Sequence, residues 1–171
     1  VDSYPYMQLL TKTKPYELSE LGKVFVNFSS FDKNTYYTKN QVIPAAHYSA
    51  SNMTESAATS TWVNSVRLQP TTDETGVVEV CDFYSDYWIE YPISVPSSGQ
   101  YDLEIRYASY RGATIGILLD GQTSKTVEMP TTGNDDVWKT ETIKIQLEQG
   151  KHSLRVKMNK GSMCMNWLRY K

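Results

Sequence analysis

The sequence lacks the excess of positive charge that marks nucleic-acid-binding proteins. Its 17 Lys and Arg residues are outnumbered by 19 Asp and Glu residues, and the formal net charge is −2. A protein that follows a phosphate backbone normally presents a basic face, whereas here the basic residues are scattered along the chain. The chain also lacks an apolar run long enough to cross a bilayer. We therefore expect neither nucleic acid nor a membrane as a partner.

Cysteine and histidine are scarce, which excludes several kinds of chemistry. The two cysteines, Cys81 and Cys164, cannot make a metal site alone and do not form a CxxC redox pair. They could form one disulfide in an oxidising compartment or remain two buried thiols. The two histidines, His47 and His152, have no recognisable Ser or Cys nucleophile motif around them. Paired carboxylates could hydrolyse glycosides, but Asp135-Asp136 is more typical of turn chemistry, so we do not expect an enzyme.

Aromatic residues, by contrast, are abundant, with thirteen Tyr and four Trp in 171 residues. Aromatic side chains that carry a polar group suit the lining of a site for an amphipathic ligand. Their more common role is to fill a core, and we expect most of them to do so.

The stretch from Tyr101 to Trp167 alternates apolar and polar residues, with turn signals between the runs. Such alternation is typical of β-strands with one buried face. The apolar positions of three runs are Tyr101, Leu103, Ile105 and Tyr107; Ile143, Ile145 and Leu147; and Leu154, Val156 and Met158. Short strands without intervening helical patterns predict an all-β protein, a sandwich of two antiparallel sheets.

The N-terminal part of the chain is the least regular. The polar run 29–41 has no periodicity, and a clear pattern begins only at Val42 and Ile43. We therefore divide the chain into an N-terminal arm, residues 1–41, and a β-sandwich, residues 42–171. The arm could be an edge strand or the tail of a preceding domain.

An ordered set of motifs carries a resemblance to a known family. The chain reads IPAAHYSASNMTE from residue 43, YWIEY from 87, VPSSGQYDLEIRYAS from 95, then LLDG, a TG turn followed by WKT, LEQGKHSLRV and finally NWLRY. Over residues 43–171 this order and spacing resemble carbohydrate-binding module family 6. The resemblance implies a jelly-roll β-sandwich that binds sugars and is usually attached to a polysaccharide-degrading enzyme.

The first sugar site that the resemblance implies lies at the loops along the edge of the sandwich. There the family places a sugar ring between an aromatic residue and a loop Trp, with an Asn of the last strand on the hydroxyls. In this chain Asp135 falls where the loop Trp is expected, and Trp138 is the second Trp of that loop. Asn166 is the Asn that remains, and Tyr84 lies near the position of the first aromatic residue, at Asp82.

The second implied site lies on the concave face of one sheet, where the family uses a Trp and a Glu. This chain has both, as Trp88 and Glu55, which favours this face. Trp88 could equally be a structural tryptophan, and Glu55 could be a solvated rim residue.

The resemblance also implies a structural calcium ion held by carboxylates near both ends of the module. Calcium requires several oxygen ligands, with charge supplied by Asp or Glu. Here Pro44 and Ala46 occupy the two Glu positions, and Arg169 lies in the region of the late carboxylate. We therefore expect no calcium and no other cofactor.

The leading interpretation is a non-catalytic module that targets an attached catalytic domain to a polysaccharide or oligosaccharide. The alternative is a structural accessory sandwich of a larger glycoside hydrolase whose sugar site has been lost. A more distant one is a protein-interaction sandwich that presents tyrosines. We expect a secreted, periplasmic or cell-surface location.

Overall fold

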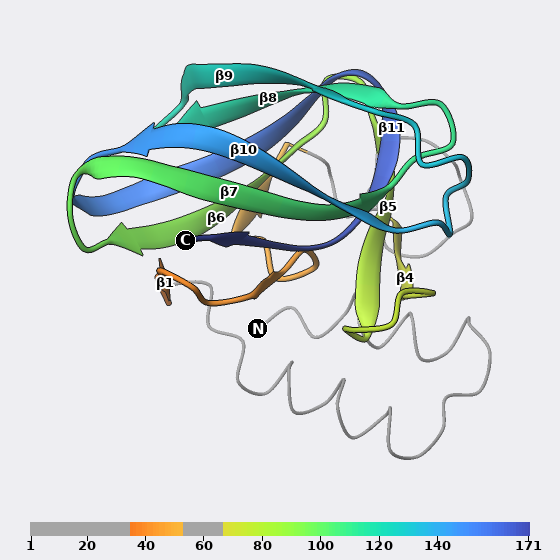
Figure 1. Ribbon diagram of the computed structural model, residues 1–171, viewed down its shortest axis with the longest axis horizontal. Helices are drawn as coiled ribbons and strands as arrows, with labels where there is room; N and C mark the ends of the chain where they lie inside the picture. The colour runs from red at the N-terminus through yellow and green to blue at the C-terminus, as the bar shows by residue number, and fades with distance from the viewer. Residues whose placement is uncertain (1–34, 53–66) are drawn as a thin grey trace.

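The computed structural model describes residues 35–52 and 67–171, and every regular element in these ranges is a strand (Figure 1). The strands are β1 (Tyr37–Thr38), β2 (Ile43–Pro44), β3 (Ala50–Ser51), β4 (Arg67–Pro70), β5 (Val78–Tyr84), β6 (Trp88–Val95), β7 (Gly99–Ala108), β8 (Ala113–Leu119), β9 (Gln122–Met129), β10 (Lys139–Leu147) and β11 (Gly150–Tyr170). The predicted jelly-roll β-sandwich is confirmed. In the described part of the chain, no helix could span a membrane.

The strands form two layers that share β11. In the first sheet, β6 pairs with β1 and β3 and with the first half of β11, which is followed by β8 and β9. In the second sheet, β4, β5, the second half of β11, β7 and β10 lie in that order, and β2 also pairs with β11. All of these pairs are antiparallel except β1 with β6.

The passage of β11 from one sheet to the other depends on a glycine. The register of β11 against β8 shifts between Met158 and Lys160, just before Gly161. Gly161 has a φ of 83°, and a Cβ atom there would lie 2.6 Å from the carbonyl oxygen of Gly112. A residue with a side chain would be strained and would clash with the neighbouring backbone.

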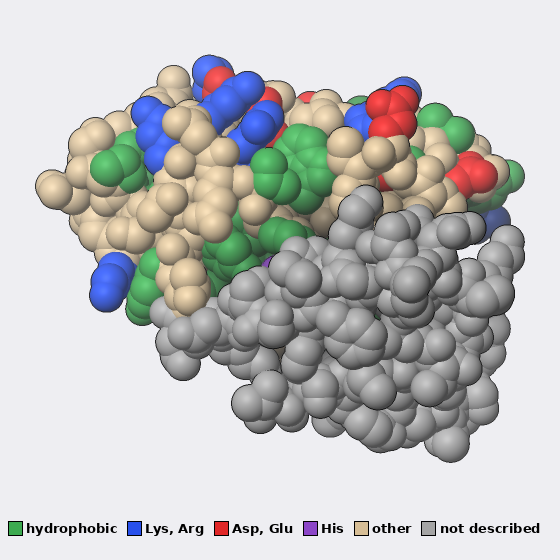
Figure 2. Space-filling view, turned by 90° about the horizontal axis from the view of Figure 1, so that it is seen from below, with side chains coloured by type: hydrophobic (Ala, Val, Ile, Leu, Met, Phe, Trp, Pro, Cys, Tyr) green, Lys and Arg blue, Asp and Glu red, His purple; other side chains and the backbone are tan. Residues whose placement is uncertain are grey.

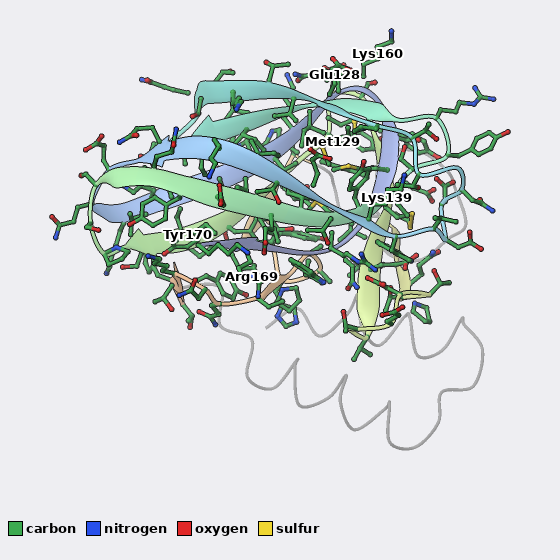
Figure 3. The ribbon with its side chains drawn as sticks, viewed as in Figure 1. Glu128, Met129, Lys139, Lys160, Arg169 and Tyr170 are labelled. Carbon is green, nitrogen blue, oxygen red and sulfur yellow. A yellow bond between two sulfur atoms is a disulfide. The ribbon has the colours of Figure 1, made fainter. Side chains whose placement is uncertain are left out.

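The core lies between the two sheets, and the apolar side chains of the alternating runs fill it (Figure 3). The apolar positions of the three predicted runs are all buried. Several tyrosines also lie in the core, and their hydroxyls donate to carbonyls at its rim, as between Tyr91 and Ala45 at 2.6 Å. Tyr107 donates to the carbonyl of Pro130 at 2.8 Å. These tyrosines therefore have the packing role expected for most of them.

The N-terminal boundary of the sandwich is less simple than its centre. Tyr37, in β1, is 7% exposed and belongs to the core, although it lies within the predicted arm. The division at residue 41 stays a prediction. Glu55 lies outside the described residues.

One disulfide ties β5 to β11. Cys81 and Cys164 are bonded, with their Cα atoms 4.3 Å apart. The register of the two strands shifts here, because two residues of β5, Cys81 and Asp82, lie opposite one residue of β11, Cys164, and Asp82 adopts a φ of 55°. This β-bulge brings Cys81 opposite Cys164 and decides between the two alternatives that the sequence left open.

Candidate functional site

The outer face of the first sheet carries Trp88 among charged side chains. In β6 the buried residues alternate with partly exposed ones, so Trp88 and Glu90 share the face that points away from the core. The register of β11 places Lys157 opposite Trp88 and Arg155 opposite Glu90. These four side chains, two from each strand, form what we call the Trp88 face.

Arg155 fixes the indole of Trp88. Its guanidinium carbon lies 3.6 Å from the centre of the indole, and its Nε donates to Glu90 Oε2 at 2.9 Å. A cation in contact with an indole face is an attractive arrangement, strongest where water is partly excluded. The backbone amide of Trp88 also donates to Asn52 Oδ1 at 2.9 Å. Trp88 is therefore held at its backbone and on one face of its ring.

Further polar groups extend the Trp88 face toward β8. Lys157 lies 3.9 Å from the carboxylate of the exposed Asp86. Beyond Lys157 the next strand presents Gly116, whose missing side chain leaves room for the amide of Asn159. The face thus offers an aromatic ring together with carboxylate, ammonium, guanidinium and amide groups. This combination can stack on the C–H face of a sugar and hydrogen-bond its hydroxyls.

At the other candidate site, Trp138 packs against the protein. Its ring lies against the small cluster formed by Cys81, Cys164 and Ala108 on the outer side of the second sheet. Its Nε1 donates to Thr72 Oγ1 at 2.9 Å. The polar group and part of the ring are thus occupied by contacts within the chain.

Asn166 is enclosed by the loop between β4 and β5. It is only 2% exposed, and its Nδ2 donates to Asp73 Oδ2 at 2.8 Å and to the carbonyl of Thr75 at 2.7 Å. Asp73 also accepts two hydrogen bonds from Arg106, at 2.8 and 2.7 Å. Burial by itself would raise the pKa of Asp73, but the hydrogen bonds from Arg106 and Asn166 lower it below its usual value. This network holds the loop between β4 and β5 in place over Asn166.

The other two predicted residues of the loop site face solvent. Asp135 accepts a hydrogen bond from the backbone amide of Tyr110 at 2.9 Å and thereby joins two loops. Tyr84, at the end of β5, is 44% exposed and donates to Asp82 Oδ1 at 3.2 Å. The structure therefore brings Tyr84, Trp138, Asp135 and Asn166 to one end of the second sheet and places Trp88 on the other layer.

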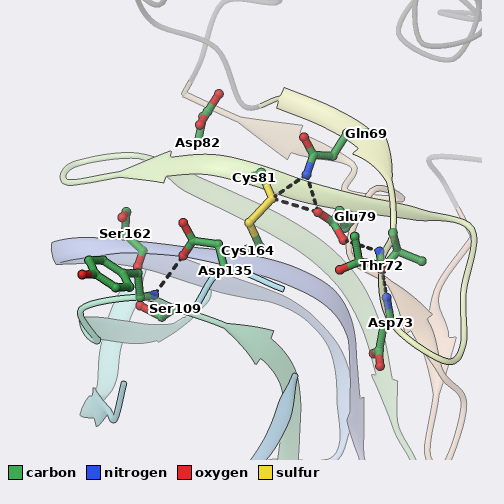
Figure 4. The surroundings of a disulfide bond; sticks show 12 residues. Gln69, Thr72, Asp73, Glu79, Cys81, Asp82, Ser109, Asp135, Ser162 and Cys164 are labelled. Atoms are coloured by element: carbon green, nitrogen blue, oxygen red, sulfur yellow. Dashed lines mark hydrogen bonds between the residues drawn. A yellow bond between two sulfur atoms is a disulfide. The ribbon is translucent and has the colours of Figure 1, made fainter. Parts of the chain in front are cut away.

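A buried carboxylate lies beside the disulfide (Figure 4). Glu79 is 1% exposed and accepts hydrogen bonds from Gln69 Nε2 and, at 3.2 Å, from the backbone amide of Thr72. Glu79, Cys81 and Cys164 are the metal-ligating residue types that cluster in the described part of the chain. Because the two sulfurs are bonded to each other, they offer no thiolate to a metal ion.

The residues at the implied calcium position do not fit a calcium ion. Pro44 and Ala46 have no side-chain oxygen, and Pro44 pairs with Trp167 in the sheet. Arg169 donates to the carboxylate of Glu104 at 2.8 and 2.6 Å. Calcium requires several oxygen ligands, whereas the three side chains at this position are two aliphatic groups and a guanidinium, which carry no oxygen. The absence of calcium stays a prediction.

A cavity of about 300 Å³ opens between β2, the loop before β5 and the second half of β11. Its lining is mostly apolar and consists of Val42, Pro44, Ala46, His47, Thr75, Gly76, Val77, Val78, Asn166 and Trp167. Figure 2 shows a face on which hydrophobic side chains gather near the middle and Lys and Arg side chains gather toward the upper edge. His47, which lines the cavity, is itself buried. This burial lowers the pKa of His47 to about 4, so its imidazole is neutral at pH 7.

The sequence did not reveal the partners of these residues. Arg155 lies opposite Glu90 because β6 and β11 are neighbours in the sheet, although the two residues are 65 positions apart in the sequence. Asp73 lies in an irregular loop, 93 residues from Asn166, and no local pattern connects the two.

Comparisons with known proteins identify a matching family and a similar protein for this chain. The family model described as "Carbohydrate binding module (family 6)" matches residues 56–171. The alpha subunit of clotting factor G from Tachypleus tridentatus is 30% identical over 109 residues, which is 61% of this chain and 16% of that subunit. The chain thus spans a small part of this curated relative.

Two solved structures are similar in both sequence and fold. One is a family 6 module of lichenase 5A from Cellvibrio mixtus, in complex with cellotriose, with 27% identity and a TM-score of 0.66 over 77% of this chain and 95% of that one. The other is the C-terminal family 6 module of LamC, a marine laminarinase from Zobellia galactanivorans. It has 26% identity and a TM-score of 0.65 over 77% of this chain and 98% of that one.

Proposed function

We propose that this chain, which belongs to carbohydrate-binding module family 6, binds chains of β-linked glucose without modifying them. The observation that carries the proposal is the Trp88 ring, held on one face by Arg155 and surrounded by hydrogen-bonding groups on an outer sheet face. The proposal has two parts, the class of sugar and the position of the site.

The class of sugar is supported by the relatives. Modules of this family are non-catalytic and are often attached to glycoside hydrolases. The lichenase module was solved with cellotriose, a chain of β-1,4-linked glucose, and the other module belongs to a laminarinase. A gluco-configured β-glycan has equatorial hydroxyls and flat C–H faces, which suit an aromatic surface with polar groups around it.

The position is supported by the chemistry of the Trp88 face. Arg155 covers one side of the indole, and we assign the other side to the pyranose ring. Lys157 lies opposite Trp88 in the sheet, and Glu90 is the next residue of β6 on the same face, so both would serve the hydroxyls, together with the amide of Asn159. Glu55 remains part of the proposed site on the strength of the family resemblance.

The expected affinity is modest. One stacked ring contributes about 0.5–1.5 kcal/mol beyond its buried area, and each neutral hydrogen bond contributes roughly 1 kcal/mol net. Association and the ordering of long side chains such as those of Arg155 and Lys157 oppose these gains. Dissociation constants in the micromolar to millimolar range would follow.

A module of this kind directs an attached polysaccharide-degrading domain to its substrate, and we propose that role here. An oxidising location, secreted, periplasmic or on the cell surface, is supported by the Cys81–Cys164 disulfide, because such bonds persist outside the reducing cytosol.

A second candidate function is that of a structural accessory sandwich. It is favoured by the end of the second sheet that carries Tyr84, Trp138, Asp135 and Asn166, which we call the loop end. There Asn166 and Trp138 form hydrogen bonds with Asp73, Thr75 and Thr72 and are not presented to solvent. This candidate predicts that the chain binds no glycan.

The test is a titration of the chain with cellotriose and with laminaritriose by calorimetry, repeated with Trp88→Ala. Saturable heat that is lost in Trp88→Ala supports both the sugar class and the site. Tyr36→Ala is a matched control, because Tyr36 is another partly exposed aromatic residue that contacts a cation, Lys151. No heat with either sugar would favour the accessory sandwich.

A further inference from the structure

We propose that Cys81, Cys164 and Glu79 form a binding site for a soft divalent metal ion, such as zinc or cadmium, when the disulfide is reduced. The disulfide and the metal ion exclude each other, because two sulfurs that are bonded to each other offer no thiolate. The inference does not depend on sugar binding. It starts from a buried carboxylate that has no part in the Trp88 face and does not belong to the apolar core.

Glu79 is buried against the two sulfurs. Glu79 and Cys81 are two residues apart on β5, so their side chains leave the same face of the strand. Glu79 is 1% exposed, and its Oε1 lies 3.2 Å from Cys81 Sγ. Cys164, on the neighbouring strand β11, completes the group, and the possible ligand atoms of the three residues lie within 4.8 Å of one another. Burial of a carboxylate is costly, and a bound cation is one of the arrangements that offset this cost.

The distances suit a tetrahedral ion. Zinc binds thiolates at about 2.3 Å and carboxylate oxygens at about 2.0–2.2 Å, which places neighbouring ligand atoms roughly 3.6–3.8 Å apart. The distance of 3.2 Å between Glu79 Oε1 and Cys81 Sγ is close to this spacing. The Cα atoms of Cys81 and Cys164 are 4.3 Å apart, so rotation about the Cα–Cβ bonds separates the sulfurs once the bond between them is broken. Water would supply the fourth ligand.

Neighbouring polar groups are placed to orient these ligands. Gln69 Nε2 donates to Glu79 Oε1 and lies 3.4 Å from Cys81 Sγ, and the backbone amide of Thr72 donates to Glu79 Oε2 at 3.2 Å (Figure 4). Such outer partners fix the orientation of metal ligands and raise the affinity for the ion. Trp138 packs against the two cysteines and covers the group on one side. The partners that a metal site requires are therefore present around the disulfide.

The ligand set selects the kind of ion. Two thiolates favour zinc and cadmium over magnesium and calcium, which prefer oxygen ligands. Two thiolates and the carboxylate of Glu79 carry three negative charges against the two positive charges of the ion. The donors on Gln69 and Thr72 would stabilise the remaining negative charge.

Opening the site takes two electrons and two protons. A dithiol reductant supplies them: the bond between the sulfurs of Cys81 and Cys164 breaks, each sulfur becomes a thiol, and the two thiols of the reductant become a disulfide. The metal ion then displaces both thiol protons and binds the thiolates. In an oxidising compartment the two sulfurs pass their electrons to another disulfide, bond to each other and release the ion. The metal-bound form thus belongs to the chain in a reducing compartment.

The experiment titrates the reduced full chain with cadmium ion, whose thiolate complexes absorb ultraviolet light. The chain is reduced by a phosphine, which takes oxygen from water to become its oxide and is then removed under argon. One equivalent of cadmium should bind with the absorption of a thiolate complex and should raise the melting temperature of the reduced chain. Zinc should compete for the same site. The oxidised chain should show neither the absorption nor the rise in melting temperature.

Variants test the contribution of each ligand. Glu79→Gln keeps the size of the side chain and an acceptor oxygen, and it should weaken cadmium binding at least about tenfold, since even outer partners of metal ligands have effects of this size. Glu74→Gln is the matched control, because it makes the same substitution at an exposed residue of the preceding loop, and it should bind as the unchanged chain does. Replacing both cysteines with Ser should abolish the absorption.

A titration in urea separates a folded site from two unconnected thiols. At a urea concentration that unfolds the reduced chain, cadmium binding should be at least about tenfold weaker, because the carboxylate no longer lies beside the sulfurs. Equal affinity in urea and in buffer would overturn the proposal. Equal affinity of Glu79→Gln and the unchanged chain would also overturn it, as would a reduced chain that binds no cadmium. None of these outcomes bears on sugar binding, so the proposed function is tested separately.

Discussion

The Trp88 face and the interior of the loop end contain the same kinds of side chain in opposite situations. Trp88 is stacked with Arg155 on an outer sheet face, and charged and amide groups surround it. Trp138 packs on the disulfide and donates to Thr72, while Asn166 is buried under Asp73. A polar group whose hydrogen bonds are satisfied within the chain contributes to stability and has little left for a ligand. Residue type by itself therefore does not identify a sugar site.

Removing the disulfide should give the largest change, and it concerns the loop end. Replacing Cys81 and Cys164 with Ser should lower the free energy of unfolding by about 3–4 kcal/mol, because the bond closes a loop of 83 residues. Urea unfolding with and without reductant measures this. Sugar binding at the Trp88 face should persist at temperatures where the variant is folded, and its complete loss would break the separation of the two regions.

Asp73→Ala tests whether the network around Asn166 is structural. The Asp73 side chain is 2% exposed and serves both Arg106 and Asn166, so its removal leaves two buried or partly buried donors without an acceptor. The free energy of unfolding should fall by about 2–3 kcal/mol in urea unfolding. Asp136→Ala is the matched control, since Asp136 is an exposed turn residue and the loss of its side chain should cost almost nothing. Equal stability of the two variants would contradict the assigned role.

The fold could be predicted from the sequence because it depends on local alternation. Leu103, Ile105 and Ile143 read as one-sided strands in the sequence and are buried in the structure. The site could be predicted only in part, because the roles of its residues depend on distant partners. Asn166 is engaged by a residue 93 positions away, and the disulfide depends on a bulge at Asp82. Neither contact leaves a pattern in the sequence.

Arg155→Ala tests whether Arg155 positions the indole of Trp88. The variant loses the cation that covers one side of the indole and the partner of Glu90, so the ring is less well fixed. Affinity for cellotriose should fall about threefold to tenfold, in line with the worth of such a contact. Arg155→Lys keeps the charge but not the planar stack and should recover only part of the loss. An unchanged affinity in calorimetry would show that Arg155 does not position Trp88.

The smallest effect is expected from the Asp120–His152 pair, far from both regions. His152 Nδ1 lies 2.7 Å from Asp120 Oδ2, and this hydrogen bond raises the pKa of His152 and lowers that of Asp120. The stability due to the raised pKa of His152 is present below its unfolded value of about 6.5 and is lost as the pH rises through the folded value. Melting temperatures between pH 5 and 9 should show a slightly smaller decline for Asp120→Asn than for the unchanged chain. A larger decline in the variant would contradict this.

The contrast between the two tryptophans tests the central claim most directly. Calorimetric titration of Trp88→Ala and Trp138→Ala with cellotriose, side by side, separates a ligand contact from a packing contact. We predict at least a tenfold loss of affinity for Trp88→Ala, about 1.4 kcal/mol, and for Trp138→Ala a lower melting temperature with affinity within about twofold of the unchanged chain. Loss of binding in Trp138→Ala with full binding in Trp88→Ala would contradict the account.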